Sequence, residues 1–224
     1  AGKFAIADDS FYVAWAEPSR EFHQRYLDEQ LRKAALFPQI SSEIALFGDQ
    51  ESNGDTMNDR LFLLTFDSGP TQSPGTTDWL ADFLRKQSIR ASFFVLGNSL
   101  QMRLDKSGGQ AVQALYKGQC VGVQGWEYRS HSHWQAWQDS ILRSAALVRQ
   151  VLPHNYLAQF RPPYGQRRED SGAFFQGQGI QVSLWDIDAQ DMAANLGAEE
   201  SAQRVLSLML LWRHGVIKFH DTQD

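Results

Sequence analysis

Short apolar runs recur along the chain from residue 61 onward, about one in every 30 residues, the length of one strand–helix–strand unit. Each run is rich in β-branched or aromatic residues, and a polar stretch follows it. This pattern predicts strands at residues 61–66, 91–96, 120–124, 157–160, 180–185 and 216–219.

Apolar residues at helical spacing fill several of the gaps between these strands. They predict helices at 78–87, 140–152 and 199–212; in the first, Trp79, Leu80, Phe83 and Leu84 share one face. Alternating strands and helices favour parallel strands joined by right-handed crossovers, in a barrel or an open doubly wound sheet. In both architectures the catalytic and ligand-binding residues lie on loops at the carboxyl ends of the strands.

The first 60 residues lack this alternation. We expect a short strand at 11–15, an amphipathic helix at 21–37 and an exposed polar connector at 49–59. The predicted organisation is therefore an N-terminal extension at 1–60 followed by one α/β domain at 61–224.

Composition and charge narrow the class of protein. Of the 224 residues 42% are hydrophobic, which is enough to bury a sizeable core. The apolar stretch at 205–212 is too short to span a bilayer, so we expect no transmembrane segment. The net charge is −5 and the longest basic run is Arg167-Arg168, which argues against nucleic acid as a partner.

Residues able to act as acid and base follow the predicted strands. Asp67 comes directly after the first strand, where a general base would stand. Arg161 follows the fourth strand and can orient a carboxylate, and Pro162 and Pro163 leave the amide of Tyr164 free for another partner. His220 ends the last strand and can act as a general acid.

Taken in order, these segments resemble the polysaccharide deacetylases, the NodB-homology type of carbohydrate esterase family four. Residues 65–70 match the family's Thr-Phe-Asp-Asp-Gly-Pro motif at five of six positions, and Arg161 to Gly165 keep Arg-Pro-Pro-Tyr-Gly intact. Trp185 with Asp188 to Asp191, the strand ending in His220-Asp221 and the signature at 91–97 also match. The resemblance covers residues 60–224.

The resemblance implies a distorted parallel (β/α) barrel that removes N-acetyl or O-acetyl groups from a polysaccharide such as an N-acetylglucosamine polymer or peptidoglycan. It implies Asp67 as base, with Arg161 orienting it, and the Tyr164 amide as a donor to the oxyanion. It further implies His220 as the acid, with Asp191 tuning it. It suggests a secreted, periplasmic or cell-envelope location.

The divalent metal that the resemblance implies is zinc, held by an aspartate and two histidines four residues apart. Ser68 stands at the aspartate position. The histidine positions fall on Gln124 and Tyr128 when counted from Gly118, or on Glu127 and His131 when counted back from Ser130 with a three-residue insertion. We favour Glu127 and His131, because the downstream helix pattern fits that alignment better and the spacing allows one ion to be clamped.

These substitutions leave two main hypotheses: a deacetylase with a rebuilt or weaker metal site, and a catalytically silent relative that binds glycan, with no metal. A glycoside hydrolase using Asp67 with Asp188 or Asp191 is a third, weaker hypothesis, which the Arg161–Gly165 motif and His220 oppose.

Aromatic residues near the motif loops predict a sugar-binding surface, because aromatic rings stack on pyranose faces. The candidates are Trp126 and Trp134, with Pro163 and Tyr164 from the proline loop; Trp137 and Trp185 lie nearby in sequence, and a core position is the better expectation for Trp185.

The family usually continues past the His-Asp motif with a helix and a last strand. This chain ends at Asp224, so we expect either a trimmed domain or completion of the barrel by residues 1–60, and we favour the former.

Overall fold

The computed structural model describes residues 18, 20–29, 31, 48–194 and 196–222, and the chain divides into two compact units, Ala1–Ser42 and Glu43–Asp224. In the first unit, residues 18, 20–29 and 31 are helical. The predicted strand at 11–15 and the end of the predicted helix, 32–37, lie outside the described residues.

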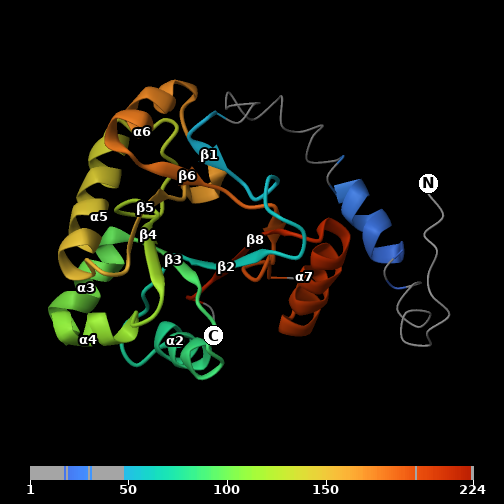
Figure 1. Ribbon diagram of the computed structural model, residues 1–224, viewed down its shortest axis with the longest axis horizontal. Helices are drawn as coiled ribbons and strands as arrows, with labels where there is room; N and C mark the ends of the chain where they lie inside the picture. Colours follow the sequence, from blue (N-terminus) through green and yellow to red (C-terminus); the bar gives the residue numbers. More distant parts are fainter. Residues whose placement is uncertain (1–17, 19, 30, 32–47, 195, 223–224) are drawn as a thin grey trace. The chain divides into compact units, whose positions relative to one another are not determined.

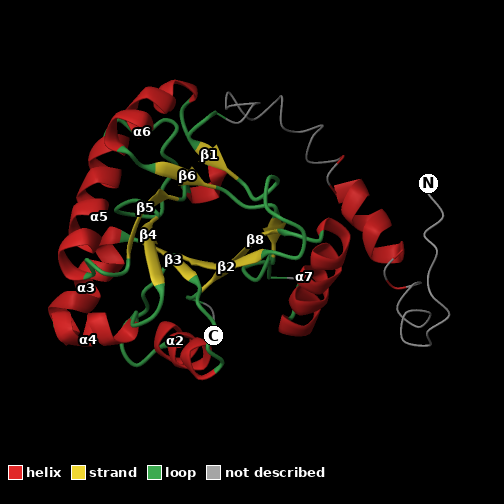
Figure 2. Ribbon diagram, in the orientation of Figure 1, coloured by secondary structure: helices red, strands yellow, loops and turns green. Residues whose placement is uncertain are grey.

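The second unit is built on one sheet of eight parallel strands in the order β1-β6-β5-β4-β3-β2-β8-β7 (Figure 1). The strands are β1 (Glu51–Ser52), β2 (Phe62–Asp67), β3 (Ser92–Val95), β4 (Cys120–Val123), β5 (Tyr156–Phe160), β6 (Gln181–Ser183), β7 (Ile187–Asp188) and β8 (Gly215–His220). The sheet curls into a half-barrel, and in the described residues no pairing joins β1 to β7 (Figure 2). The predicted α/β fold with a distorted parallel barrel is confirmed in this form.

Helices lie along the outside of the curled sheet (Figure 2). They are α2 (Thr76–Lys86), α3 (Gly97–Ser107), α4 (Gly109–Leu115), α5 (Trp137–Val151), α6 (Gly172–Gln178) and α7 (Ala198–Trp212), with short 3-10 turns η1 (Pro163–Gly165) and η2 (Glu169–Ser171). None of the helices in the described part of the chain has both the length and the apolar character needed to cross a membrane.

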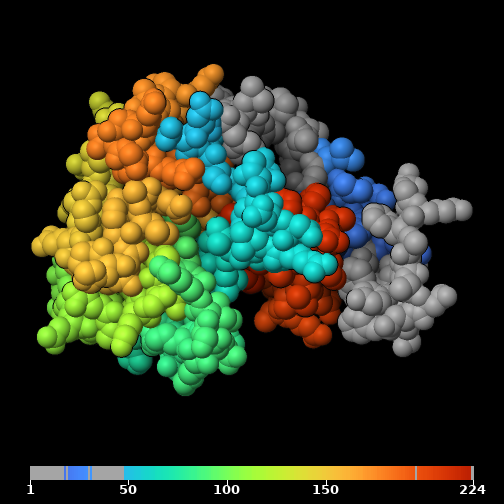
Figure 3. All heavy atoms as spheres, in the orientation of Figure 1, coloured from blue at the N-terminus to red at the C-terminus, as the bar shows by residue number. Residues whose placement is uncertain are grey.

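The edge strand β1 comes from the segment predicted as an exposed connector. Glu51 pairs with Val182 and Ser52 with Ser183, so the sheet begins before residue 61. Figure 3 shows the light-blue segment near residue 50 against the orange part of the chain. Arg167 holds this edge by contacts of its Nε and Nη2 with the Glu51 carboxylate at 2.5 and 2.7 Å. The segment before β2 is therefore part of the sheet.

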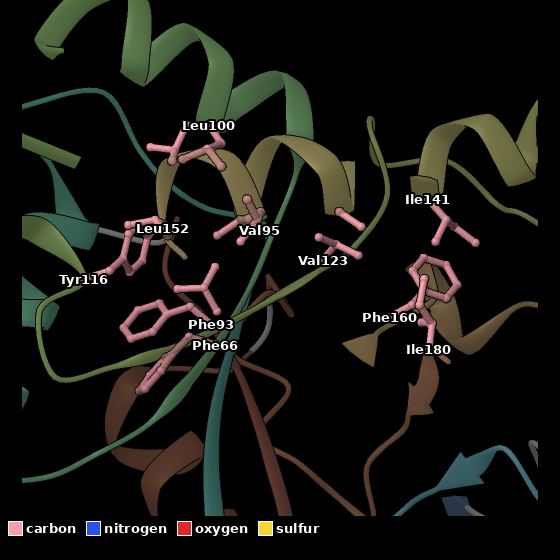
Figure 4. Packing of buried hydrophobic residues seen from close by; sticks show 14 of the residues in the cluster. Phe66, Phe93, Val95, Leu100, Tyr116, Val123, Ile141, Leu152, Phe160 and Ile180 are labelled. Carbon is pink, nitrogen blue, oxygen red and sulfur yellow. The ribbon is translucent and has the colours of Figure 1, made fainter. Parts of the chain in front are cut away.

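The core is rich in aromatic rings from the strands and the helices against them (Figure 4). Phe66 of β2 stacks on Phe93 of β3 with ring centroids 5.3 Å apart, and Phe93 meets Tyr116 edge to face at the same separation. Three consecutive residues of β3, Phe93 to Val95, are buried, so both faces of this strand are covered and its apolar residues form a continuous run rather than an alternating one.

Candidate active site

The carboxyl ends of neighbouring strands bring the predicted acid and base together. Asp67 is the last residue of β2 and lies in register with His220, the last residue of β8. Ser68 follows β2, Gln124 follows β4 and Arg161 follows β5, all at the same edge of the sheet. The parallel topology therefore assembles one cluster from four separate segments.

Asp67 and Arg161 form a buried ion pair. Arg161 Nη1 lies 3.0 Å from Asp67 Oδ1, and the two side chains are 0% and 2% exposed, respectively. Burial raises the pKa of the Asp67 carboxyl, and the charge of Arg161 opposes that rise. A guanidinium stays protonated even when burial lowers its pKa, so Arg161 supplies a positive charge that favours the ionised form of Asp67.

Other contacts fix the orientation of Arg161. Its Nη1 donates to Thr65 Oγ1 at 2.6 Å, its Nε to the Ser183 carbonyl at 3.1 Å and its Nη2 to the Leu184 carbonyl at 3.1 Å. Thr65 Oγ1 in turn donates to the Ile217 carbonyl at 2.6 Å. Thr65 was missed as a site residue, although its place two residues before Asp67 puts both side chains on one face of β2.

Gln124 bridges the two residues that follow one another at the end of β2. Its Nε2 donates to Asp67 Oδ2 at 3.3 Å, and its Oε1 accepts from Ser68 Oγ at 3.0 Å. Ser68 adopts a left-handed backbone with φ 78°, which is costly for a serine and turns its side chain toward this bridge. Gln124 is a ligand position in the alternative alignment, the one counted from Gly118.

The favoured ligand pair, Glu127 and His131, is placed elsewhere. His131 is buried, with Nδ1 2.7 Å from the Arg129 carbonyl and Nε2 2.9 Å from Ser140 Oγ, so both ring nitrogens have protein partners. Burial lowers its pKa to about 4, which leaves the ring neutral. The Glu127 carboxylate is half exposed and lies 3.9 Å from Arg129. His131 is thus a packed residue of the loop before α5, with neither ring nitrogen free to hold an ion in this structure.

The residues around Asp67 do not fit the zinc ion that the resemblance implies. Beside Asp67 the ligand positions hold a neutral hydroxyl in Ser68, an amide in Gln124 and a phenol in Tyr128. Zinc in proteins takes thiolate, imidazole and carboxylate ligands. In the described residues no group of three or more His, Cys, Asp or Glu side chains is arranged to hold a metal ion.

Tyr128 packs against Tyr164. Their ring centroids are 4.8 Å apart at an interplanar angle of 62°. The charge of Asp67 acts on the Tyr128 hydroxyl. Desolvation is the main cause that raises the pKa of Tyr128 to about 12, so it is a neutral phenol at physiological pH.

His220 and Asp191 form the second predicted pair. His220 Nδ1 lies 2.8 Å from Asp191 Oδ1, and the His220 amide donates to Asp191 Oδ2 at 2.6 Å. This arrangement fixes the imidazole and directs Nε2 away from Asp191, as a proton donor requires. Nearby, Lys218 pairs with Asp188 at 3.2 Å and lies 4.0 Å from the Trp185 ring centroid, contacts that sequence reasoning missed.

The tryptophans predicted to bind sugar pack against other side chains of the protein. The guanidinium of Arg143 lies 3.5 Å from the ring centroid of Trp126, and Trp134 packs against His131 at 5.2 Å between centroids. Trp137 belongs to the core and Pro163 is buried. Tyr128 and Tyr164, 41% and 61% exposed, offer open aromatic surface beside Asp67.

Comparison with known proteins places these features in a family. The model of the polysaccharide deacetylase family matches residues 54–182. Peptidoglycan-N-acetylmuramic acid deacetylase PdaC of Bacillus subtilis is 25% identical over 170 residues, which make up 75% of this chain and 34% of that protein. The chain thus spans about a third of the length of that relative.

Two solved structures share the fold. The Bc1960 peptidoglycan N-acetylglucosamine deacetylase superposes with a TM-score of 0.67 at 20% identity, covering 77% of both chains. BA3943 of Bacillus anthracis, described as a CE4 family pseudoenzyme, superposes with a TM-score of 0.65 at 14% identity, covering 79% of this chain and 60% of that one. A mutant of BA3943 is described as having restored enzymatic activity. With its parallel half-barrel, its clustered motif residues and its match to the family model, this chain belongs to the polysaccharide deacetylase family.

Proposed function

We propose that this protein binds a polysaccharide at the Asp67 site without removing acetyl groups by zinc chemistry. The observation that carries the proposal is the Gln124 amide, which links Ser68 and Asp67 where the family resemblance expects a metal. Each polar atom of this bridge has a protein partner, so the cluster is satisfied by hydrogen bonds alone.

The class of ligand follows from the family and from the exposed rings of Tyr128 and Tyr164. The relative PdaC and the structurally similar Bc1960 are named as deacetylases of N-acetylated sugars of peptidoglycan. Aromatic faces suit pyranose rings, and the net charge of −5 disfavours polyanions. We therefore propose peptidoglycan or another N-acetylglucosamine polymer as the ligand, and the cell envelope as the place of action.

Metal retention tests the first part of the proposal. Protein loaded with zinc or cobalt and then desalted is expected to keep less than one equivalent. The variant Ser68→Asp/Gln124→His/Tyr128→His restores a carboxylate and two imidazoles and is expected to keep about one equivalent. The variant Ser68→Asn/Gln124→Asn/Tyr128→Phe changes the same positions without creating ligands and serves as the control. Tight stoichiometric zinc in the unaltered protein would overturn the proposal.

Calorimetry with N-acetylglucosamine oligomers and peptidoglycan fragments tests the second part. Binding without acetate release is expected. Tyr164→Ala should weaken it, because the exposed ring is lost from the site. Trp79→Ala removes an equally exposed aromatic residue from α2 and should leave the affinity unchanged. Equal loss in both variants, or no binding to the unaltered protein, contradicts the assignment of the site.

A second candidate function, acetyl-group hydrolysis at a rebuilt site, is favoured by the two intact pairs Asp67–Arg161 and Asp191–His220. These pairs are the base and acid that amide or ester hydrolysis needs. Acetate release from N-acetylglucosamine oligomers, peptidoglycan fragments or acetylated xylan would be measured with each divalent metal in turn and with a chelator. Were activity present, Asp67→Asn should abolish it and His220→Ala should reduce it by about 10²–10⁴-fold. No release under any condition rules this candidate out.

A further inference from the structure

The ring of Trp126 supports an arginine rather than standing open to a sugar. The guanidinium carbon of Arg143 lies 3.5 Å from the ring centroid, which is van der Waals contact. At this distance the guanidinium lies flat on the indole, because a tilted group would push a nitrogen into the ring. That face of Trp126 is therefore closed to a pyranose, whereas Arg143 is exposed and the N–H donors at the edge of its guanidinium face outward.

Trp126 is itself held firmly. Its amide donates to Ser140 Oγ at 2.7 Å, and its carbonyl accepts from the Asn98 amide at 2.9 Å. A Cβ at Gly97 would lie 2.5 Å from the ring, so the start of α3 approaches it closely. The ring thus orders the Arg143 side chain in advance, which reduces the entropy that an arginine loses when it binds a ligand.

Arg143 has no acidic partner in the part of the chain that the structure describes. No hydrogen bond or ion pair engages its guanidinium there, and Asp139, one turn earlier on α5, lies beyond ion-pair distance. Arg129 differs, because the Glu127 carboxylate lies 3.9 Å from it. Arg143 therefore presents an ordered guanidinium that lacks a carboxylate, and a guanidinium binds a carboxylate through two parallel hydrogen bonds.

Arg143 lies at the edge of the sheet that carries the Asp67 site. Trp126 comes two residues after Gln124, whose Nε2 contacts Asp67, and two residues span at most about 7 Å. The helix α5 runs from the carboxyl ends of the strands toward their amino ends, and Arg143 stands in its second turn. A glycan bound at Asp67 can therefore extend to Arg143 through neighbouring sugars.

We propose that Arg143, stacked on Trp126, binds a carboxylate carried by the glycan. This inference rests on the proposed function and narrows its ligand class to polysaccharides in which some of the sugars bear a carboxylate. The net charge of −5 works against a dense polyanion. Carboxylates spaced along an otherwise neutral chain avoid this repulsion and still meet the guanidinium at contact distance. Trp126 is a positioning residue in this arrangement.

Calorimetry with two tetrasaccharides tests the inference. One is a peptide-free peptidoglycan fragment in which alternate sugars carry a lactyl carboxylate, and the other is the same fragment with its carboxyl groups converted to amides. The unaltered protein is expected to bind the charged fragment about fivefold more tightly, the upper end of the range for an exposed ion pair. Arg143→Gln should abolish this preference and leave the affinity for the amidated fragment unchanged.

The matched control is Arg149→Gln. Arg149 also belongs to α5, and its guanidinium carbon lies 5.1 Å from the ring centroid of Tyr156. Tyr156 begins β5, so this pair stands at the opposite edge of the sheet from Asp67. The control changes the net charge by the same amount and should keep the preference. An equal loss in both variants would reveal a long-range charge effect and overturn the inference.

Two variants of Trp126 test its positioning role. Trp126→Phe keeps an aromatic face for the guanidinium and should keep most of the preference, whereas Trp126→Leu should reduce it to about twofold. The affinity for the amidated fragment should stay unchanged in both. Equal weakening of both fragments in Trp126→Leu contradicts a positioning role.

The two fragments also separate this inference from the proposed function. Equal binding of both by the unaltered protein overturns the inference and leaves the proposed glycan binding standing. Tetraglutamate bound through Arg143 as tightly as the charged fragment also overturns it, because the site would then serve an acidic peptide. Binding of neither fragment contradicts the proposed function, and the inference with it.

Discussion

Arg161 is the residue on which the buried part of the site depends. Its guanidinium is fully buried, ion-paired to Asp67 and bonded to Thr65, Ser183 and Leu184. Removing one partner of a buried pair leaves an uncompensated charge, whereas removing both can be nearly neutral.

We therefore expect Arg161→Met to lower the free energy of unfolding by about 3–5 kcal/mol. Asp67→Asn/Arg161→Met should recover part of that loss. Urea unfolding of Asp67→Asn, Arg161→Met and the double variant gives the coupling free energy between the two residues. Additive losses would show that Asp67 and Arg161 do not depend on one another.

Asp221 is buried directly after His220. Its Oδ2 accepts from Thr77 Oγ1 at 2.9 Å, and in the described residues no hydrogen-bond partner reaches its Oδ1. Burial is the main cause that raises its pKa from 3.8 to about 7, and the charge of Asp67 adds to the rise. The folded protein thus holds a proton here that the unfolded chain releases at much lower pH.

A raised pKa of an acid means that stability falls as pH rises from about 4 to 7. Each pKa unit corresponds to about 1.4 kcal/mol, so this contribution is at most about 4 kcal/mol. His131, with its pKa lowered to about 4, acts in the opposite sense below pH 6.5.

The variant Asp221→Asn removes the Asp221 contribution and leaves that of His131 in place. Urea unfolding at a series of pH values gives the free energy of unfolding of both proteins. Between pH 4 and 7 the variant should become more stable relative to the unaltered protein. A difference that stays constant across this range contradicts a buried neutral Asp221.

The positions of the residues proposed as acid and base could be predicted because Asp67 and His220 each end a strand within a recognisable motif. Asp67, Arg161, Asp191 and His220 lie in the pairs expected of them. Whether Gln124 or Glu127 occupies the first histidine position of the family could not be decided, because the segment between β4 and α5 has no regular period to align. The hydrogen bonds of Gln124 depend on a turn whose path only the folded chain defines.

At the scale of elements, Gly97 and Gly109 begin consecutive helices in different surroundings. A Cβ at Gly97, at the start of α3, would lie 2.5 Å from the Trp126 ring and 2.7 Å from Ser144 Oγ. At Gly109, at the start of α4, the closest atom would be 3.9 Å away. The start of α3 is therefore packed against α5 and the loop before it, whereas the start of α4 is open.

We expect Gly97→Ala to lower the free energy of unfolding by about 1–3 kcal/mol through overpacking. Gly109→Ala should raise it by about 0.4–1 kcal/mol, because alanine restricts the unfolded chain and fits the space. Thermal unfolding of both variants beside the unaltered protein checks the pair. Equal effects would mean that Trp126 does not lie against α3.

The six longer strands and the three long amphipathic helices were predictable because burial imposes their periods, whereas the two-residue strands β1 and β7 and the short helix α6 were missed. The predicted strand at 61–66 became Phe62–Asp67, and the predicted helix at 199–212 became Ala198–Trp212. The helices α3 and α4 were missed: they pack through few apolar positions, with a buried Arg103 among them. In such segments tertiary contacts decide the structure, not the local pattern.

For the whole molecule, the sheet and every contact of the site belong to the unit Glu43–Asp224. A protein that starts at Glu43 should therefore fold cooperatively and keep the site. Near-ultraviolet circular dichroism and urea unfolding would test this, with a single transition as the expected result. A broad, non-cooperative transition would show that residues 1–42 are needed for folding.

The bridge made by Gln124 also has an evolutionary consequence. An aspartate at position 68 alone would set a second carboxylate beside Asp67 with no cation between them, and a histidine at 124 alone would remove the amide that serves both Asp67 and Ser68. Each single exchange is unfavourable, whereas the joint exchange supplies a carboxylate and an imidazole that can bind a cation together. Among homologous chains, positions 68 and 124 should therefore covary, serine accompanying glutamine and aspartate accompanying histidine.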